Sequence, residues 1–166
     1  MFREGRSSYP KWFVSRDIEC KDSPVHGAGI FATKDIPKHT MIESSPCLVL
    51  HQNSMEALHE INDSRHILQD YVFHWDPGFV AVAMGWVAIY NHDDDSNCQW
   101  RPNLELKSLE ITTIKDVKAG EELFIKYLPA KLSSLLWFEQ EGKEIRREDM
   151  EYAWHKMKQT PDWKKL

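Results

Sequence analysis

Short β-prone runs alternate with turn-forming residues through the first three quarters of the chain, and this alternation constrains the fold more than any other feature. Gly27 and Gly29 predict one turn, and Pro77 with Gly78 predicts another. Between such turns, β-branched and aromatic residues favour an extended backbone. The predicted strands span residues 13–20, 29–34, 41–50, 71–75, 79–84, 103–117 and 123–127. Pro46 is expected to break the third of them, since proline cannot donate to a sheet.

The remaining segments have helical patterns. Asn53 or Ser54 is expected to cap a short helix that ends at Ile61. Apolar residues at helical spacing predict two further helices at residues 131–142 and 144–158. Many strands followed by helices indicate an α+β fold that is rich in β-structure. The predicted domains are residues 1–129, which hold the strands, and residues 130–166, a C-terminal helical extension.

Composition narrows the class of protein. The chain has 166 residues, of which 42% are hydrophobic, so a globular domain is expected. A formal net charge of -5 disfavours direct nucleic-acid binding, which needs a basic face, and favours a Lys-rich protein partner. No stretch approaches the ~20 apolar residues of a membrane span, and the N-terminus lacks the apolar core of a signal peptide. The three cysteines lack a zinc-binding spacing, so we expect free thiols in a cytoplasmic protein without membrane contact.

Three short motifs can carry function, although each also has a plain structural reading. Residues 26–29 read His-Gly-Ala-Gly, which alone fits a β-turn. Residues 91–97 read Asn-His-Asp-Asp-Asp-Ser-Asn, which alone fits a solvated turn. Residues 120–127 read Gly-Glu-Glu-Leu-Phe-Ile-Lys-Tyr, which alone fits a hairpin and a strand aromatic. A metal site at residues 92–95 is a minority alternative, because hard cations bind carboxylates but no second cluster completes the site.

In this order and spacing, the three motifs resemble those of the SET domain, the fold of the protein lysine methyltransferases. The resemblance covers roughly residues 13–129 and is strongest to compact SET-only proteins of bacterial or viral type. It implies the SET fold, a β-clip of short strands with a knot-like C-terminal crossing. It also implies that S-adenosyl-L-methionine donates a methyl group to the ε-amine of a lysine in a protein substrate, with S-adenosyl-L-homocysteine as the product. For a viral protein, the expected location is the host cytoplasm.

The resemblance also implies roles for individual residues. Tyr127, the terminal tyrosine of the third motif, is the implied catalytic residue, since its hydroxyl would orient the amine and polarise the methyl donor. Trp100 reads equally well as a half-buried strand residue, and Trp137 as a core residue. The implied cofactor-binding residues are His26, Gly27, Ala28, Gly29, Tyr90, Asn91, His92, Tyr127 and Trp137. The implied substrate-channel residues are Tyr71, Trp100, Ile125, Asp94 and Asp95. A displacement at carbon needs no metal, so none is expected.

Four residues depart from the family pattern: Ser44, Asp93, Ser96 and Ile125. They stand where many relatives carry tyrosine, serine, proline and an aromatic residue, respectively. Two alternatives therefore stay open, a non-catalytic SET-like protein-binding module and methyl transfer to another acceptor. A homodimer is also left open. We expect residues 93–95 to form an acidic rim that steers a positively charged lysine segment inward.

Overall fold

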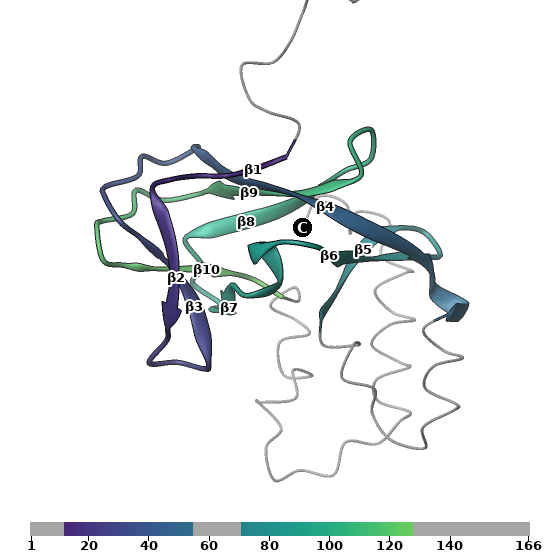
Figure 1. Ribbon diagram of the computed structural model, residues 1–166, viewed down its shortest axis with the longest axis horizontal. Helices are drawn as coiled ribbons and strands as arrows, with labels where there is room; N and C mark the ends of the chain where they lie inside the picture. The colour runs from purple at the N-terminus through teal and green to yellow at the C-terminus, as the bar shows by residue number, and fades with distance from the viewer. Residues whose placement is uncertain (1–11, 55–70, 128–166) are drawn as a thin grey trace, which may run out of the picture. The chain divides into compact units, whose positions relative to one another are not determined.

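The computed structural model describes residues 12–54 and 71–127, and within these ranges the chain forms two β-sheets (Figure 1). The first sheet contains β1 (Phe13–Val14), β4 (Met41–His51), β5 (Val72–Asp76), β6 (Phe79–Ala83), β8 (Cys98–Asn103) and β9 (Ser108–Thr113). The second sheet contains β2 (Ile18–Asp22), β3 (Ala28–Ala32), β7 (Asn91–His92) and β10 (Glu122–Ile125). A 3-10 helix, η2 (Trp86–Ala88), lies between β6 and β7 in the sequence. The predicted β-rich character is confirmed for these residues.

The long strand β4 organises the first sheet. It pairs with β9 from Met41 to Pro46 and with β6 from Cys47 to His51. The predicted break at Pro46 is therefore wrong, because the strand continues through the proline. The missing N–H is tolerated because Pro46 lies where the partner strand changes, and its carbonyl accepts a hydrogen bond from the N–H of Met84 at 2.9 Å.

Two predicted strands include a turn. Residues 13–20 form β1 and most of β2, which belong to different sheets. Residues 103–117 contain the turn between β8 and β9 and then β9 itself. The side-chain oxygen of Asn103 accepts a hydrogen bond from the N–H of Leu106 at 3.0 Å, which ends β8. The single long strand predicted there was wrong because alternating polarity continued through this turn.

Other predicted boundaries agree more closely. The strands at residues 71–75 and 79–84 are confirmed as β5 and β6, with Gly78 in the turn at φ 80°. The predicted strand at residues 29–34 corresponds to β3, and the last strand ends at Ile125 rather than at Tyr127.

The short helix after β4 begins before its predicted cap. Residues 52–54 are already helical, and Nδ1 of His51 accepts a hydrogen bond from the N–H of Asn53 at 3.3 Å. His51 therefore takes the capping position that the sequence assigned to Asn53 or Ser54. Residues 55–61 of this predicted helix lie outside the described residues.

Strand β10 lies between β3 and β7 in the second sheet (Figure 1). It pairs antiparallel with β3 and parallel with β7, so three segments that are distant in sequence become neighbours. These segments carry the three motifs. Ile30, Leu123 and Ile125 are fully buried, and each such side chain contributes roughly 1.5–3 kcal/mol through the hydrophobic effect. The motifs are therefore held by the core of one sheet.

The chain divides into two compact units, residues 1–125 and residues 126–166. The predicted C-terminal helices and Trp137 lie outside the described residues. The predicted boundary after residue 129 and the knot-like crossing stay predictions. Within residues 12–54 and 71–127, no helix has the length and apolar character to cross a membrane.

Candidate active site

The carboxylate of Glu122, at the start of β10, is the centre of a buried polar network. Its Oε1 accepts a hydrogen bond from Nδ2 of Asn91 at 2.8 Å, and its Oε2 accepts one from the hydroxyl of Ser23 at 2.9 Å. Glu122 is 8% exposed and Asn91 is 7% exposed, so water is largely excluded from their contact. Hydrogen bonds accepted by a carboxylate are among the stronger ones in proteins. The network joins the loop before β3 to β7 and β10.

The side-chain amide of Asn91 also holds the turn that precedes β3. Its Nδ2 lies 3.2 Å from the carbonyl oxygens of both His26 and Ala28. One amide group therefore contacts the turn and Glu122 at the same time. The resemblance assigned Asn91 to a cofactor, and the structure shows that its amide nitrogen is used to hold the protein's own backbone.

The two glycines of the turn have different surroundings. A Cβ atom at Gly29 would lie 2.2 Å from Oε1 of Glu122, so glycine is needed there for the carboxylate to enter. Gly27 adopts φ 52°, which glycine reaches without steric cost, and the space at its Cβ position is open. Both glycines are cofactor-binding residues according to the resemblance to the SET domain. The space beside Gly29 is filled by Glu122, whereas Gly27 leaves open space at an exposed turn.

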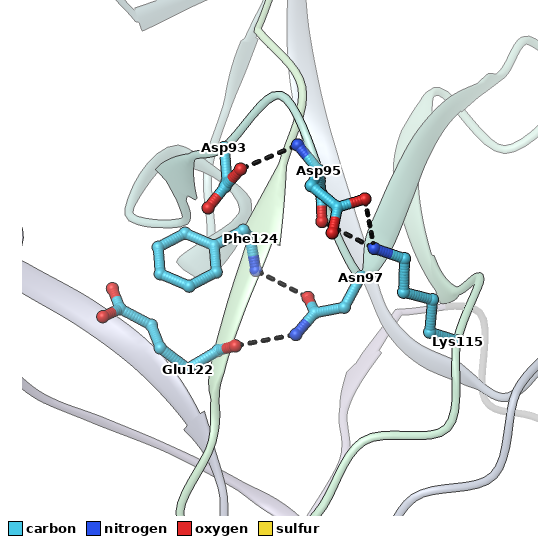
Figure 2. A network of polar contacts seen from close by, with 6 residues as sticks. All are labelled: Asp93, Asp95, Asn97, Lys115, Glu122 and Phe124. Atoms are coloured by element: carbon cyan, nitrogen blue, oxygen red, sulfur yellow. Dashed lines mark hydrogen bonds and ion pairs between the residues drawn. The ribbon is translucent and has the colours of Figure 1, made fainter.

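Asn97 fixes the loop after β7 to the main chain of β10 (Figure 2). Its Nδ2 donates a hydrogen bond to the carbonyl oxygen of Glu122 at 2.8 Å, and its Oδ1 accepts one from the N–H of Phe124 at 2.8 Å. A side-chain amide can satisfy one acceptor and one donor of a strand in this way. The loop that carries the acidic run, residues 93–95, is therefore fixed to β10 at its C-terminal end.

The aspartates that follow His92 are partly paired (Figure 2). Oδ1 of Asp93 accepts a hydrogen bond from the N–H of Asp95 at 2.7 Å, which forms a local turn. The carboxylate of Asp95 lies 2.6 Å from Nζ of Lys115, and Oδ1 of Asp94 lies 3.7 Å from Nε2 of His92. Among the described residues, no three His, Cys, Asp or Glu side chains are grouped to hold a metal ion.

Tyr90 lies in the core rather than at the exposed turn. Its side chain is fully buried, and its hydroxyl interacts electrostatically with the carboxyl of Glu43 of β4. Burial raises the pKa of the Tyr90 hydroxyl well above its usual range, and the carboxyl of Glu43 raises it further. Burial also raises the pKa of Glu43, although hydrogen bonds from Ser45 and Val87 act against this. A direct role of Tyr90 in cofactor binding stays a prediction.

Trp100 of β8 contacts Phe73 of β5, although these strands lie at opposite ends of the pairing order of the first sheet. The ring centroids are 5.2 Å apart and the planes are inclined by 75°, an edge-to-face arrangement. The sheet must curve to bring these rings together, and its inner face gains an aromatic wall. Trp100 was a predicted site residue, whereas Phe73 was not.

The other predicted residues are more scattered. Tyr71 lies just before β5 and is 46% exposed, whereas Ile125 is fully buried at the end of β10. Tyr127 is half-buried and follows Ile125 by two residues. The side chain of His92, next to Asn91, is only 7% exposed. The network thus unites the residues of the turn with β7 and β10, while Trp100 belongs to the aromatic wall.

The turn before β3 can bind the polar end of a ligand. Its backbone is exposed, and the bonds from Asn91 keep it in place without a ligand. The open space beside Gly27 lets another molecule approach the main chain closely. A preorganised polar turn of this kind suits a charged amino-acid group, because little ordering is needed on binding.

Comparisons with known proteins address the fold and the family. Residues 27–128, more than half of the chain, match the SET domain. The chain is 30% identical over 134 residues to a histone-lysine N-methyltransferase of Schizosaccharomyces pombe that is specific for lysine 37 of H3, which covers 81% of this chain and 85% of that protein. A solved structure of a Plasmodium falciparum protein, described as a histone methyltransferase, is similar with a TM-score of 0.55 and 20% identity. That match covers 70% of this chain and 97% of the other, and it supports the fold.

Proposed function

This chain belongs to the SET-domain family and is a protein-lysine methyltransferase, and we propose that it binds S-adenosylmethionine against the turn before β3. The observation that carries the proposal is the bond between Asn91 and Glu122, because it ties this turn to the buried centre of the second sheet. The turn is thereby fixed before any ligand arrives. Such preorganisation raises the affinity for a ligand, because little conformational entropy of the turn is lost on binding.

The residues at the turn fit the amino-acid end of S-adenosylmethionine. The exposed main chain of Gly27 and Ala28 would hold this end, while Asn91 bonds the carbonyl oxygens of His26 and Ala28 on either side of Gly27. His92 follows directly and would contribute through its backbone. When bound, S-adenosylmethionine supplies an activated methyl group, and no metal is required for its transfer.

The lysine acceptor has to be neutral to attack the methyl group. Its ordinary pKa of about 10.4 makes the neutral form cost roughly 4–5 kcal/mol at pH 7. An apolar wall lowers that pKa, because burial disfavours the ammonium form. We assign this role to Trp100 and Phe73, whose rings contact each other on the inner face of the first sheet. Tyr127 would orient the amine through its hydroxyl.

The proposed substrate is a lysine within a basic, histone-like protein segment. The relative from Schizosaccharomyces pombe is specific for lysine 37 of H3, and this chain has a net charge of -5. An acidic protein attracts a Lys-rich segment and speeds its association. Within residues 93–95 we expect Asp94 to contribute most to this attraction, since Asp95, although more exposed, is paired with Lys115 at 2.6 Å.

Calorimetry and mass spectrometry test the proposal together. Full-length chain is titrated with S-adenosylhomocysteine, and we expect saturable binding with one site per chain. The chain is then incubated with histone H3 and S-adenosylmethionine that carries a tritiated methyl group, and the labelled residue is identified. A non-catalytic SET-like module would bind without labelling any protein, and label on another residue type would identify a different acceptor. Failure to bind S-adenosylhomocysteine would contradict the proposed site.

Several finer features belong to the same proposal. The knot-like crossing of the C-terminal strand is supported by the position of β10 between β3 and β7. Trp137 would cover the adenine of the cofactor. We also propose a cytoplasmic location, an acceptor that is a protein rather than a nucleic acid, and function without a membrane. Size-exclusion chromatography with light scattering would distinguish a monomer from a homodimer.

A further inference from the structure

A second buried carboxylate lies on the first sheet, outside the network of Glu122. Glu43 of β4 is fully buried. Its Oε1 accepts hydrogen bonds from the hydroxyl of Ser45 at 2.5 Å and from the main-chain N–H of Val87 at 2.9 Å. Its carboxyl group also interacts electrostatically with the hydroxyl of Tyr90. An apolar residue would avoid the cost of burying a carboxyl group, so these contacts need an explanation.

The chain makes room for this carboxylate at Gly85. A Cβ atom there would lie 1.9 Å from the hydroxyl oxygen of Ser45 and 3.0 Å from Oε1 of Glu43. The arrangement repeats the one at Gly29, where the missing Cβ admits Glu122. The missing Cβ thus makes room for Glu122 itself at Gly29, and at Gly85 for Ser45, whose hydroxyl donates to Glu43.

Both carboxylates act on the same short segment, residues 85–91. Glu43 bonds the main chain of Val87 in its first half and interacts with Tyr90 near its end, and Glu122 contacts Asn91 at its last position. The segment contains only the single turn of η2, whose own hydrogen bonds are those from the N–H of Ala88 at 3.4 Å and of Ile89 at 2.7 Å. One 3-10 turn fixes little by itself, since short helices are marginal without external contacts. The position of Asn91 therefore depends on contacts from outside the segment.

We propose that Glu43 is a positioning residue of the cofactor site, which holds η2 and Tyr90 so that Asn91 reaches Glu122 and the turn before β3. The inference rests on the proposed function, because it concerns the site that binds S-adenosylmethionine. Glu43 acts through Val87 and Tyr90 and need not touch the cofactor. Two carboxylates from two different sheets then clamp one segment between them.

Variants of Glu43 test the proposal through binding rather than through turnover. The dissociation constant for S-adenosylhomocysteine is measured by calorimetry on the full-length chain. Glu43→Ala should raise it at least ~10-fold, and Glu43→Gln, which keeps an acceptor in the same place, should stay within ~3-fold of wild type. Tyr90→Phe removes one contact and keeps the ring, so a rise of ~3-fold to ~10-fold is expected.

A matched control separates positioning from a general loss of stability. Ile36→Val shortens a buried side chain in the bridge to Val117, outside the clamped segment. We expect it to lower the melting temperature while the dissociation constant stays within ~2-fold of wild type. Hydrogen exchange at the amide of Val87 is a second readout that needs no ligand. Exchange should speed up in Glu43→Ala and not in Ile36→Val.

The possible outcomes are distinct. If folded Glu43→Ala and Tyr90→Phe both bind S-adenosylhomocysteine as wild type does, the proposal is overturned. If Glu43→Ala does not fold, Tyr90→Phe decides alone, and wild-type binding by it overturns the proposal. If wild type itself binds no S-adenosylhomocysteine, the proposed function fails, and faster exchange at Val87 would then still support the clamp without the cofactor.

Discussion

The side-chain nitrogen of Asn91 lies 2.8 Å from Oε1 of Glu122, although the two residues are 31 positions apart in the chain. The same nitrogen lies 3.2 Å from two carbonyl oxygens of the turn before β3. A single contact therefore joins the three motifs that the sequence presents separately. The site depends on these bonds, because they tie the turn that would bind the cofactor to the buried carboxylate of Glu122.

Replacing Glu122 by alanine should damage both stability and binding. The amide of Asn91 and the hydroxyl of Ser23 would lose their acceptor, and an unsatisfied buried group costs about 1–3 kcal/mol in the free energy of unfolding. Glu122→Gln retains one acceptor and should lose less. Urea denaturation measures the change. The control is Glu121→Ala at the exposed neighbour, which loses one exposed hydrogen bond from the N–H of Lys118 and should cost at most about 1 kcal/mol; equal losses in the two alanine variants would contradict our account.

Gly29→Ala should destabilise the chain through the carboxylate of Glu122. The new Cβ would meet Oε1 at 2.2 Å, and overpacking of this kind costs about 1–3 kcal/mol. Removing the carboxylate should relieve part of that cost, so Gly29→Ala combined with Glu122→Ala should lose less than the sum of the single variants. Gly120→Ala is a useful comparison, because its φ of 86° is strained but its Cβ would meet nothing within 4 Å. Strictly additive losses at Gly29 would show that the two residues do not compete for space.

The raised pKa of Glu43 predicts a dependence of stability on pH. Burial is the main cause of the rise from the ordinary value of 4.5, so the folded chain keeps a proton at Glu43 that the unfolded chain has released. Between pH 4.5 and the raised pKa, the folded state binds more protons, and the free energy of unfolding falls as the pH rises. The neighbouring groups Tyr90 and Cys98 titrate far higher, since burial raises the pKa of Cys98 to about 12.

Glu43→Gln should remove this contribution. We expect the difference in the free energy of unfolding between Glu43→Gln and wild type to shift in favour of the variant as the pH rises from 4.5 toward the raised pKa of Glu43. Urea denaturation of both proteins across this range measures it. The histidines are common to both proteins, so their titration cancels to first order. A difference that stays constant with pH would mean that Glu43 has the same pKa in the folded and unfolded chains.

The acidic run should increase the rate at which a basic protein substrate associates with the chain. Asp94→Asn combined with Asp95→Asn should raise the KM for the protein substrate and weaken its dependence on salt, because steering by charge is screened. Asp94 should account for most of the effect, since Asp95 is already paired with Lys115 at 2.6 Å. Asp35→Asn, at an exposed pair with Lys118, removes a similar charge elsewhere and serves as the control. If the double variant and this control behave alike, the run is a solvated turn.

Most of what could be predicted about the fold came from the order of the three motifs along the sequence. Short strands and turns are local features, so β5, β6 and the turn at Gly78 were predictable from neighbouring residues. The passage of β4 through Pro46 was not, because it depends on which strands lie beside the proline. The pairing of a strand is determined by packing across the whole sheet rather than by the residues of that strand alone.

The site was predictable in outline only. Glu121 and Glu122 are adjacent and chemically identical, and only the pairing of β10 decides that Glu122 is buried while Glu121 faces water. The contact between Phe73 and Trp100 arises from the curvature of a sheet whose end strands approach each other. Neither the burial of Glu122 nor the contact between Phe73 and Trp100 can be predicted from neighbouring residues, because each depends on residues that are far apart in the sequence.

Methyl transfer by the Tyr127→Phe variant tests the central claim most directly. Wild-type chain and the variant are incubated with histone H3 and labelled S-adenosylmethionine, and label on each residue is measured by mass spectrometry. We predict that wild type labels the ε-amine of a lysine, while Tyr127→Phe binds S-adenosylhomocysteine normally and turns over at least ~100-fold more slowly, in the range typical of a positioned catalytic group. Turnover that is unchanged in Tyr127→Phe, or wild-type label on no lysine, would contradict the account.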